Sequence, residues 1–392
     1  MDYFGSHSND TLYHIKNDVQ RNSANAKWQY EFSKVNDLTV KFSSSYLSQN
    51  LGTKFYAFDA TQLIYFSEIS YFHKLKKMDW VGGINMNGDI YKNKSVVLKE
   101  PNDYNYQTYG AFIQNTWLPL KKLTIEAGFR GDYHSSYGFF ALPRLSLLYK
   151  FNKKFSARVN GGFGYKTPNI ITYLNPETDL NSITSYAKLN PELSQGINAD
   201  INFHKMFSDD LTITINQSFF FTNISRPVYD SSSTAARISL VNADKALQTR
   251  GLQTYARVQY KDIELYLGYV FTDVVQLYER LHQEPPVTPK HNFAATVLYK
   301  AGEHWNTGIE SSLVGGQRDE HYNPVKNYFT FAFMLQYHAG KISVVLNTEN
   351  LFDFRQSRYG KIYDGTLDNP AFHALWAPID GRVINLSVKF AL

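Results

Sequence analysis

Arginine, histidine and aromatic residues gather in two polar segments near the C-terminus, 315–327 and 350–382. An arginine guanidinium binds anionic groups through paired hydrogen bonds, and aromatic rings stack on catecholate rings or sugars. The residues that offer this chemistry are Arg318, His321, Tyr322, Arg355, Arg358, Tyr359 and Trp376. We expect them to bind a small-molecule ligand, and packing of the two segments against each other is the alternative role for the same side chains.

Four histidines lie in or beside the longer polar segments and could ligate iron or a metal chelate through their imidazole nitrogens: His134, His282, His321 and His373. Scattered histidines in polar segments are usually solvated, which is the simpler interpretation. The sequence therefore predicts no metal site.

Enzymatic motifs are absent from the sequence. The glycine-rich run 161–167 lacks the glycine spacing of a phosphate-binding loop, and the run 364–369 offers oxygen ligands without the spacing of a calcium loop. The chain has no cysteine and no HExxH or GxSxG motif. We expect no catalytic residue and no bound cofactor, and hence a protein that is not an enzyme.

The elements that must position these residues are long strands of alternating character. In 123–133, Leu, Ile, Ala, Phe, Gly and Tyr occupy one face, and Thr, Glu, Gly, Arg and Asp occupy the other. A period of two indicates β-strand, and strands of about 11–13 residues suit a tilted crossing of a bilayer. The fold class predicted is all-β, an antiparallel transmembrane β-barrel whose apolar face, with Phe271, Phe329, Phe331 and Phe333, points outward.

About 17 strands fit this pattern between residues 26 and 391, and the connections between them alternate between short and long. Tight turns on one side and long loops on the other are typical of the periplasmic and extracellular rims of an outer-membrane barrel. The long connections are predicted at 51–60, 91–105, 135–140, 166–192, 223–246, 276–290, 315–327 and 350–382.

Charged residues fall on the inward faces of these strands. The same parity that turns aromatic residues outward places inward Glu126, Arg130, Asp132, Arg144, Arg158, Arg257, Glu264, Glu310 and Glu349. Charges are tolerated there because the lumen is wet or filled by protein, whereas a charge facing lipid at mid-depth costs about 2–4 kcal/mol. Ion pairs between neighbouring strands are the expected arrangement.

Composition agrees with a barrel and excludes other classes. The chain has 392 residues, 16% aromatic residues and a net charge of +5 without a basic run, so nucleic acid is not an expected partner. No stretch approaches the roughly 18 apolar residues of a membrane-spanning helix. In a barrel this is expected, because half of every strand faces a polar interior.

Short motifs in a fixed order carry a family resemblance: GFRGD at 128–132, PRLS at 143–146, LNPELS at 189–194, PKH at 289–291, ENLFD at 349–353 and DGR at 380–382. In this order and spacing the chain resembles the C-terminal part of the barrel of TonB-dependent outer-membrane receptors, especially those of Bacteroidetes-type bacteria. The resemblance covers 106–392, and 22–105 is compatible by pattern.

The resemblance implies a 22-stranded barrel filled by an N-terminal plug domain that contacts TonB. We accordingly expect 1–21 to be the remnant of an extracellular loop and 22–392 to be a partial barrel, without the plug and about five N-terminal strands. The implied partners are outer-membrane lipid, the missing plug and strands, the TonB complex through that plug, and the barrel-assembly machinery. Contacts with the plug would come from inward charges: Arg130, Asp132, Arg144, Arg158, Glu310 and Glu349.

The implied function is TonB-energised uptake of a scarce nutrient by an integral protein of the bacterial outer membrane. A ferric siderophore or similar iron chelate is the expected ligand, with cobalamin, haem and saccharides also open. A passive porin-like channel is the alternative, and a β-rich binding module outside the membrane is a third class.

Overall fold

A computed structural model describes residues 13–54, 57–94, 103–169, 183–186, 189–231, 238–278 and 284–390. Its main feature is one 17-stranded antiparallel sheet. The strands of this sheet are β1 (Ile15–Ser33), β2 (Asn36–Thr53), β3 (Ala57–Lys74), β4 (Met78–Asn93), β5 (Tyr104–Leu120), β6 (Leu123–His134), β7 (Gly138–Lys150), β8 (Phe155–Lys166), β10 (Glu192–Ser208), β11 (Leu211–Ser225), β14 (Leu247–Tyr260), β15 (Ile263–Gln276), β16 (His291–Ala301), β17 (Trp305–Gly315), β18 (Tyr328–Ala339), β19 (Ile342–Glu349) and β22 (Val383–Phe390).

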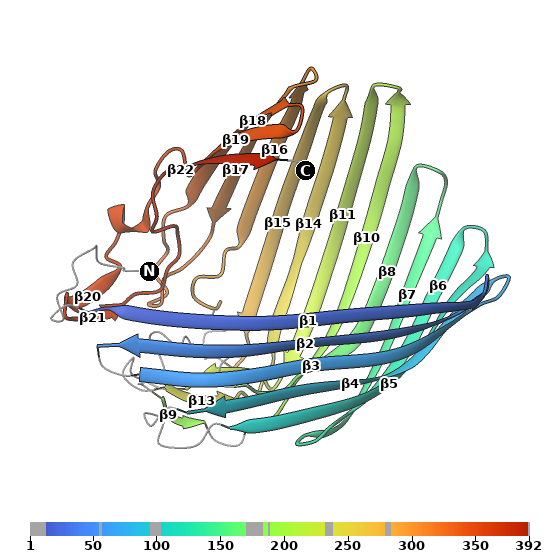
Figure 1. Ribbon diagram of the computed structural model, residues 1–392, viewed down its shortest axis with the longest axis horizontal. Helices are drawn as coiled ribbons and strands as arrows, with labels where there is room; N and C mark the ends of the chain where they lie inside the picture. Colours follow the sequence, from blue (N-terminus) through green and yellow to red (C-terminus); the bar gives the residue numbers. More distant parts are fainter. Residues whose placement is uncertain are drawn as a thin grey trace.

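Each strand of the sheet pairs with its neighbours in chain order, so the sheet is a single meander. Figure 1 shows it as a continuous curved wall, with tight turns along one rim and longer connections along the other. Five short strands lie in these longer connections and form two small sheets of their own: β9 (Ile183–Tyr186), β12 (Val228–Asp230), β13 (Ile238–Asn242), β20 (Tyr363–Thr366) and β21 (Asn369–Phe372). The predicted all-β fold and strand number are confirmed.

The register of the sheet confirms that apolar and charged residues occupy opposite faces. Ile309 on β17 lies opposite Val297 on β16 and Phe333 on β18, whereas its chain neighbour Glu310 lies opposite Thr296 and Ala332. Because side chains alternate along each strand, a cross-strand row keeps its character from one strand to the next. The outward face is therefore a continuous apolar band, as the alternation predicts.

Short turns join the strands at one rim, as the sequence predicts, although the turn predicted at 119–120 lies at 121–122 because β5 continues to Leu120. Two of the long connections are shorter than expected. Strand β2 continues to Thr53 and β3 begins at Ala57, so the predicted loop 51–60 is largely strand. Likewise β6 ends at His134 and β7 begins at Gly138, which leaves a three-residue turn where the prediction gives 135–140. Backbone pairing extends these strands past the point where the apolar pattern stops.

The first strand also begins earlier than predicted. The segment 1–21 was expected to be loop, yet β1 starts at Ile15. Residues 15–25 carry almost no apolar side chains, so the sequence gives no alternation there. Their strand conformation comes from pairing with β2, in which Asn17 lies opposite Leu51 and Gln20 opposite Ser48.

The edges of the sheet are β1 and β22, and in the part of the chain that the structure describes they do not pair with each other. The β20–β21 hairpin instead lies near the ends of β1 and β2 at the loop rim (Figure 1). The backbone N–H of Tyr13 donates to the carbonyl of Leu367 at 3.0 Å, and Lys54 pairs with Asp368 at 3.6 Å. Within the described residues, no helix has the length and apolar character needed to cross a membrane.

Candidate functional site

Two loops at the same rim form what we call the loop cluster: residues 316–327 between β17 and β18, and residues 350–382 between β19 and β22. Glu320 of the first loop accepts the backbone N–H of Ala374 in the second at 2.9 Å. The ammonium of Lys326 lies 4.0 Å from the ring centre of Tyr359, which also joins the two loops. The ligand-binding residues predicted from the sequence are thus brought together in one cluster.

Gln356 fixes the fold of the longer loop. It lies in a short 3-10 helix, η2 (Gln356–Arg358), and is 1% exposed. Its side-chain oxygen accepts the backbone N–H groups of Trp376 and Ala377 at 2.8 and 3.1 Å, and its side-chain nitrogen donates to the carbonyl of Ala374 at 3.1 Å. A buried amide with all these partners holds residues 374–377 against η2.

An aromatic layer packs beside this buried amide. Phe354 stacks on Tyr359 with ring centres 4.8 Å apart and on Tyr328 of β18 at 5.4 Å. The ring of Trp376 packs against the rings of Phe354 and Tyr328, and Trp376 is only 8% exposed. Of the two roles considered for Trp376, the structure therefore supports packing of the loop, while Tyr359 remains 48% exposed.

Asp353 organises the cationic residues of the loop. Its carboxylate accepts hydrogen bonds from the guanidinium of Arg355 at 2.7 Å, from the guanidinium of Arg358, and from the backbone N–H of Arg382 at 3.1 Å. These donors, with Arg355 the strongest, hold the pKa of the Asp353 carboxyl below its ordinary value. Both guanidinium groups keep exposed N–H groups that could receive an anion.

The other predicted residues lie in the shorter loop. The guanidinium of Arg318 donates to the carbonyl of Tyr322 at 2.8 Å, so it closes the loop on itself. Tyr322 has a positive φ of 64°, which places it at the tip of this tight turn. The side chain of His321 is 71% exposed.

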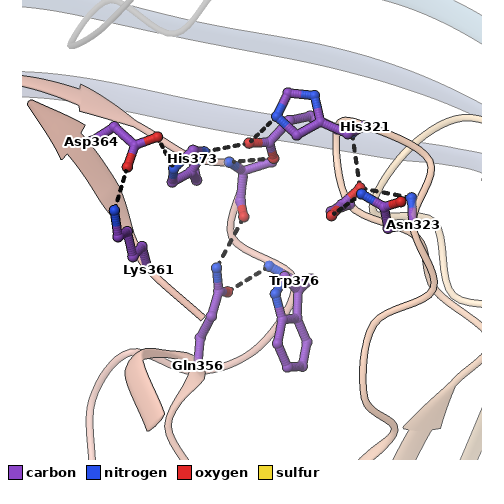
Figure 2. A network of polar contacts seen from close by, with 10 residues as sticks. His321, Asn323, Gln356, Lys361, Asp364, His373 and Trp376 are labelled. Carbon is purple, nitrogen blue, oxygen red and sulfur yellow. Dashed lines mark hydrogen bonds and ion pairs between the residues drawn. The ribbon is translucent and has the colours of Figure 1, made fainter. Parts of the chain in front are cut away.

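A histidine and two carboxylates connect the shorter loop to the β20–β21 hairpin, and Figure 2 shows their network. One ring nitrogen of His373, Nδ1, lies 2.6 Å from Glu320, and the other, Nε2, lies 3.2 Å from Asp364. Lys361 pairs with Asp364 at 3.2 Å and holds the pKa of that carboxyl low. Of the other histidines considered from the sequence, His134 lies on the inner wall, and His282 lies outside the described residues.

The inner wall carries the ion pairs that the parity predicts. Arg130 Nε lies 2.7 Å from Asp132, which is 2% exposed and also accepts the hydroxyl of Tyr165 at 3.0 Å. Arg144 pairs across the strands with Glu126 at 3.4 Å.

A second such pair lies on β14 and β15, where Arg257 bonds to Glu264 at 2.8 Å. For Arg158, Glu310 and Glu349, no ion pair forms with any residue that the structure describes. Among the described residues, some of the inward charges therefore form ion pairs and others do not.

A column of inward aromatic residues near the loop rim was missed by sequence reasoning. The ring centres of Tyr91 and Tyr104 are 5.3 Å apart, those of Tyr104 and Tyr106 are 4.5 Å apart, and His134 follows at 5.0 Å from Tyr106. Asp89 beside them accepts from the side chain of Gln62 at 2.8 Å. This column could have been predicted from the sequence, because aromatic residues occupy the polar face of adjacent strands.

A shallow hollow on β3 to β7 has a different character. Its lining includes Ile69, Ile84, Tyr109 and Phe139, which lie on the apolar face. It faces away from the inner wall and from the loop cluster, so it does not belong to the candidate site.

Comparisons with known proteins agree on one family and one fold. The family model described as TonB dependent receptor-like, beta-barrel matches residues 2–351. No curated protein matches the chain.

Among solved structures, a mutant of the ferric enterobactin receptor of Pseudomonas aeruginosa is similar, at 13% identity and a TM-score of 0.73 over 96% of this chain. The ferric-catecholate import receptor Fiu of E. coli gives 12% and 0.71 over 95%. The siderophore receptor PirA of Acinetobacter baumannii gives 15% and 0.70 over 95%. The chain spans 62%, 64% and 62% of these three proteins, and at such identities the likeness concerns the fold.

Proposed function

Because the chain belongs to the TonB-dependent receptor-like β-barrel family, we propose that it is the barrel part of a receptor for energised uptake of a ferric siderophore or similar iron chelate. Members of this family are outer-membrane receptors rather than enzymes. The family assignment disfavours a passive porin-like channel, the alternative left open by the strand pattern.

The observation that carries this proposal is the chemistry of the loop cluster. Arg355 and Arg358 are held by Asp353 with their side chains 43% and 54% exposed, and Tyr359, which follows Arg358 in the chain, is also exposed. An anionic ferric chelate with aromatic arms would offer negative charge to the two arginines and a flat ring to Tyr359. Three similar solved structures bear names of siderophore or ferric-catecholate receptors, which supports the same class of ligand.

The inner wall supports a path behind the loops. The partly exposed rings of Tyr104 and Tyr106 stack on each other at the inner face near the loop rim, where they would offer the ligand a second stacking surface, and the buried Tyr91 packs against Tyr104. We propose that Arg158, Glu310 and Glu349 contact a plug domain, since they make no ion pair with the described residues of the wall. Arg130, Asp132 and Arg144 already form ion pairs within the wall, so they would contact the plug only if those ion pairs were broken. Energy would reach the barrel from the TonB complex through that plug.

The test is binding of a ferric tricatecholate to the complete protein in detergent, followed by quenching of tryptophan fluorescence. Arg358→Glu should weaken binding more than Arg358→Gln, because glutamate adds repulsion to the loss of a hydrogen bond. Growth of the producing bacterium on the same chelate as its only iron source should fall in the same order. Unchanged binding and growth in both variants would contradict the proposed site, and ion conductance without any ligand dependence would favour the porin-like channel.

A further inference from the structure

We propose that Glu320, His321 and His373 form a binding site for a divalent transition-metal ion of the zinc class. The ion would tie the loop between β17 and β18 to the β20–β21 hairpin. This inference goes beyond the proposed function, because such an ion would be a resident part of the loop cluster whatever the barrel transports.

The three side chains already lie close enough to share one ion. One ligand atom from each residue lies within 4.8 Å of the other two. The shortest separation is 2.6 Å, between Nδ1 of His373 and Oε1 of Glu320, and Nε2 of His321 lies 4.0 Å from the same oxygen. Ligand atoms around a zinc ion stand roughly 3.2–3.5 Å apart, given bonds of about 2.0–2.2 Å. To match this range, the contact between His373 and Glu320 would open by about 0.6–0.9 Å and the exposed His321 side chain would turn toward the same oxygen.

His373 has carboxylates at both ring nitrogens, and this arrangement suits a bound cation. A neutral imidazole carries a single N–H, so it can donate to only one of the two carboxylates. If Nε2 donates to Asp364 at 3.2 Å, the lone pair of Nδ1 faces the Glu320 oxygen at 2.6 Å. Two such electron-rich atoms repel each other unless a proton or a metal ion lies between them. The close contact therefore marks a place for positive charge.

The surroundings of the three ligands are those of a supported metal site. A metal-bound histidine commonly donates its other N–H to a carboxylate, which fixes the ring and raises its basicity. Asp364 occupies this position beside His373, and Lys361 in turn holds Asp364. Glu320 has one oxygen occupied by the Ala374 N–H at 2.9 Å, which leaves Oε1 free to act as a single ligand.

The third ligand is presented by a tight turn, as Figure 2 shows. The carboxylate of Asp319 accepts the backbone N–H groups of His321 and Asn323, each at 2.9 Å. These bonds fix the backbone at His321 while its side chain stays mobile enough to reach an ion. Two imidazole nitrogens and one carboxylate suit zinc, copper or nickel better than calcium or magnesium, which prefer oxygen ligands alone. A fourth position remains for water.

The experiment is a calorimetric titration of the complete protein in detergent with zinc chloride, repeated with cobalt(II) to read the coordination from its visible absorption. We expect one zinc ion per chain, with affinity reduced at least about tenfold by His373→Ala and by Glu320→Gln. Asp364→Asn should weaken zinc by a smaller factor, as a positioning residue. His304→Ala is the matched control, since this exposed histidine lies in the short turn between β16 and β17 at the opposite rim.

A second measurement separates a metal bridge from loss of folding. Zinc should slow hydrogen exchange of backbone amides in 316–327 and 363–373 in the native protein, and should leave exchange unchanged in His321→Ala. The proposal is overturned if zinc does not bind, or if it binds equally well to the His373→Ala and native proteins. In that case the contact between Glu320 and His373 links the two loops without a metal ion. Neither result depends on whether the receptor takes up an iron chelate.

Discussion

At the scale of single residues, three carboxylates organise most of the charged contacts of the site. Asp353 gathers two guanidinium groups and a backbone N–H in the longer loop, and Glu320 gathers a histidine and a backbone N–H between the loops. Asp132 does the same on the inner wall with Arg130 and Tyr165. Each combines charge with several hydrogen bonds, which makes it more consequential than an isolated surface ion pair.

The first prediction concerns Asp353. Its pKa lies below the ordinary value of about 3.9, chiefly because of Arg355, so its contribution to loop stability is complete above that ordinary pKa. The contribution is lost only as the pH falls through the lower pKa of the folded state. Hydrogen exchange of 353–358, corrected for its intrinsic pH dependence, should therefore be constant from pH 7 to about 5 and rise below about 4.

In Asp353→Asn the same amides should exchange faster already at pH 7, because the charge that holds both arginines is gone. Asp380→Asn is the control, since it removes a carboxylate from the same loop and leaves the Asp353 contacts in place. Equal exchange in the two variants would contradict the assigned role of Asp353.

The second prediction concerns Asp132. Asp132→Ala removes the partner of Arg130 and the acceptor of Tyr165 on the inner wall, and should lower the free energy of unfolding by about 1.5–3 kcal/mol. Asp273→Ala breaks the pair with Arg250, whose side chain is 69% exposed, and should cost less than about 1 kcal/mol. Urea unfolding in micelles measures both values. A larger loss at Asp273 than at Asp132 would refute the ranking.

At the scale of elements, the strand period decides which face each side chain takes, and the cross-strand register then keeps each face uniform. On β18, Phe333 lies in a row with Ile309 of β17, and the adjacent Ala332 lies opposite Glu310. Residues that are neighbours in the sequence thus lie on opposite faces of the sheet, one apolar and one polar.

The third prediction tests this division. Phe333→Arg should place a charge on the outward face at a cost of about 2–4 kcal/mol at mid-depth of the membrane, enough to impair assembly. Ala332→Arg should be tolerated, because the new charge faces the interior beside Glu310. The amount of heat-modifiable protein in outer membranes measures both outcomes. Equal yields from the two variants would show that the assignment of faces is wrong.

At the scale of the whole molecule, the wall and the loops are held together by different interactions. The wall is held by backbone ladders between long strands, whereas the loop cluster is held by a few buried polar groups and an aromatic layer. Loops on a rigid scaffold can therefore change without unfolding the scaffold.

The fourth prediction follows from this separation. Deletion of residues 355–375 removes η2, the β20–β21 hairpin and His373, and should abolish binding of an anionic ferric chelate. Heat-modifiable barrel should remain, because no strand of the main sheet is removed. Loss of the folded barrel along with binding would show that the loop cluster supports the wall.

The fifth prediction concerns the sheet edges. In lipid, the unpaired backbone groups of β1 and β22 would each cost several kcal/mol, since no water is available to satisfy them. We propose that further strands, about five by family resemblance, pair with these edges in the working receptor, together with a plug domain. Cysteine cross-linking of β1 to β22 should fail in the native outer membrane. Efficient cross-linking of these two strands to each other would instead indicate a closed 17-stranded barrel.

The strand architecture, the two faces of the strands and the family resemblance could all be predicted from the sequence. Alternation in runs such as 123–133 is a local property, because the period of a strand fixes the side of each residue without reference to any partner. Alternation is missing in 15–25, so the sequence predicts a loop there. The structure shows that this segment is part of β1, because pairing with β2 makes it a strand.

The contacts among the loop residues and among the wall residues could not be predicted from the sequence. Trp376 looked like a ligand contact, but Gln356 and Phe354 draw it into the interior of the loop cluster. His321 and His373 lie far apart in the chain, and no sequence pattern indicates that they meet each other or Glu320. Such contacts depend on how two long connections fold back over the rim, and a periodic pattern cannot encode this because loop conformation has no period.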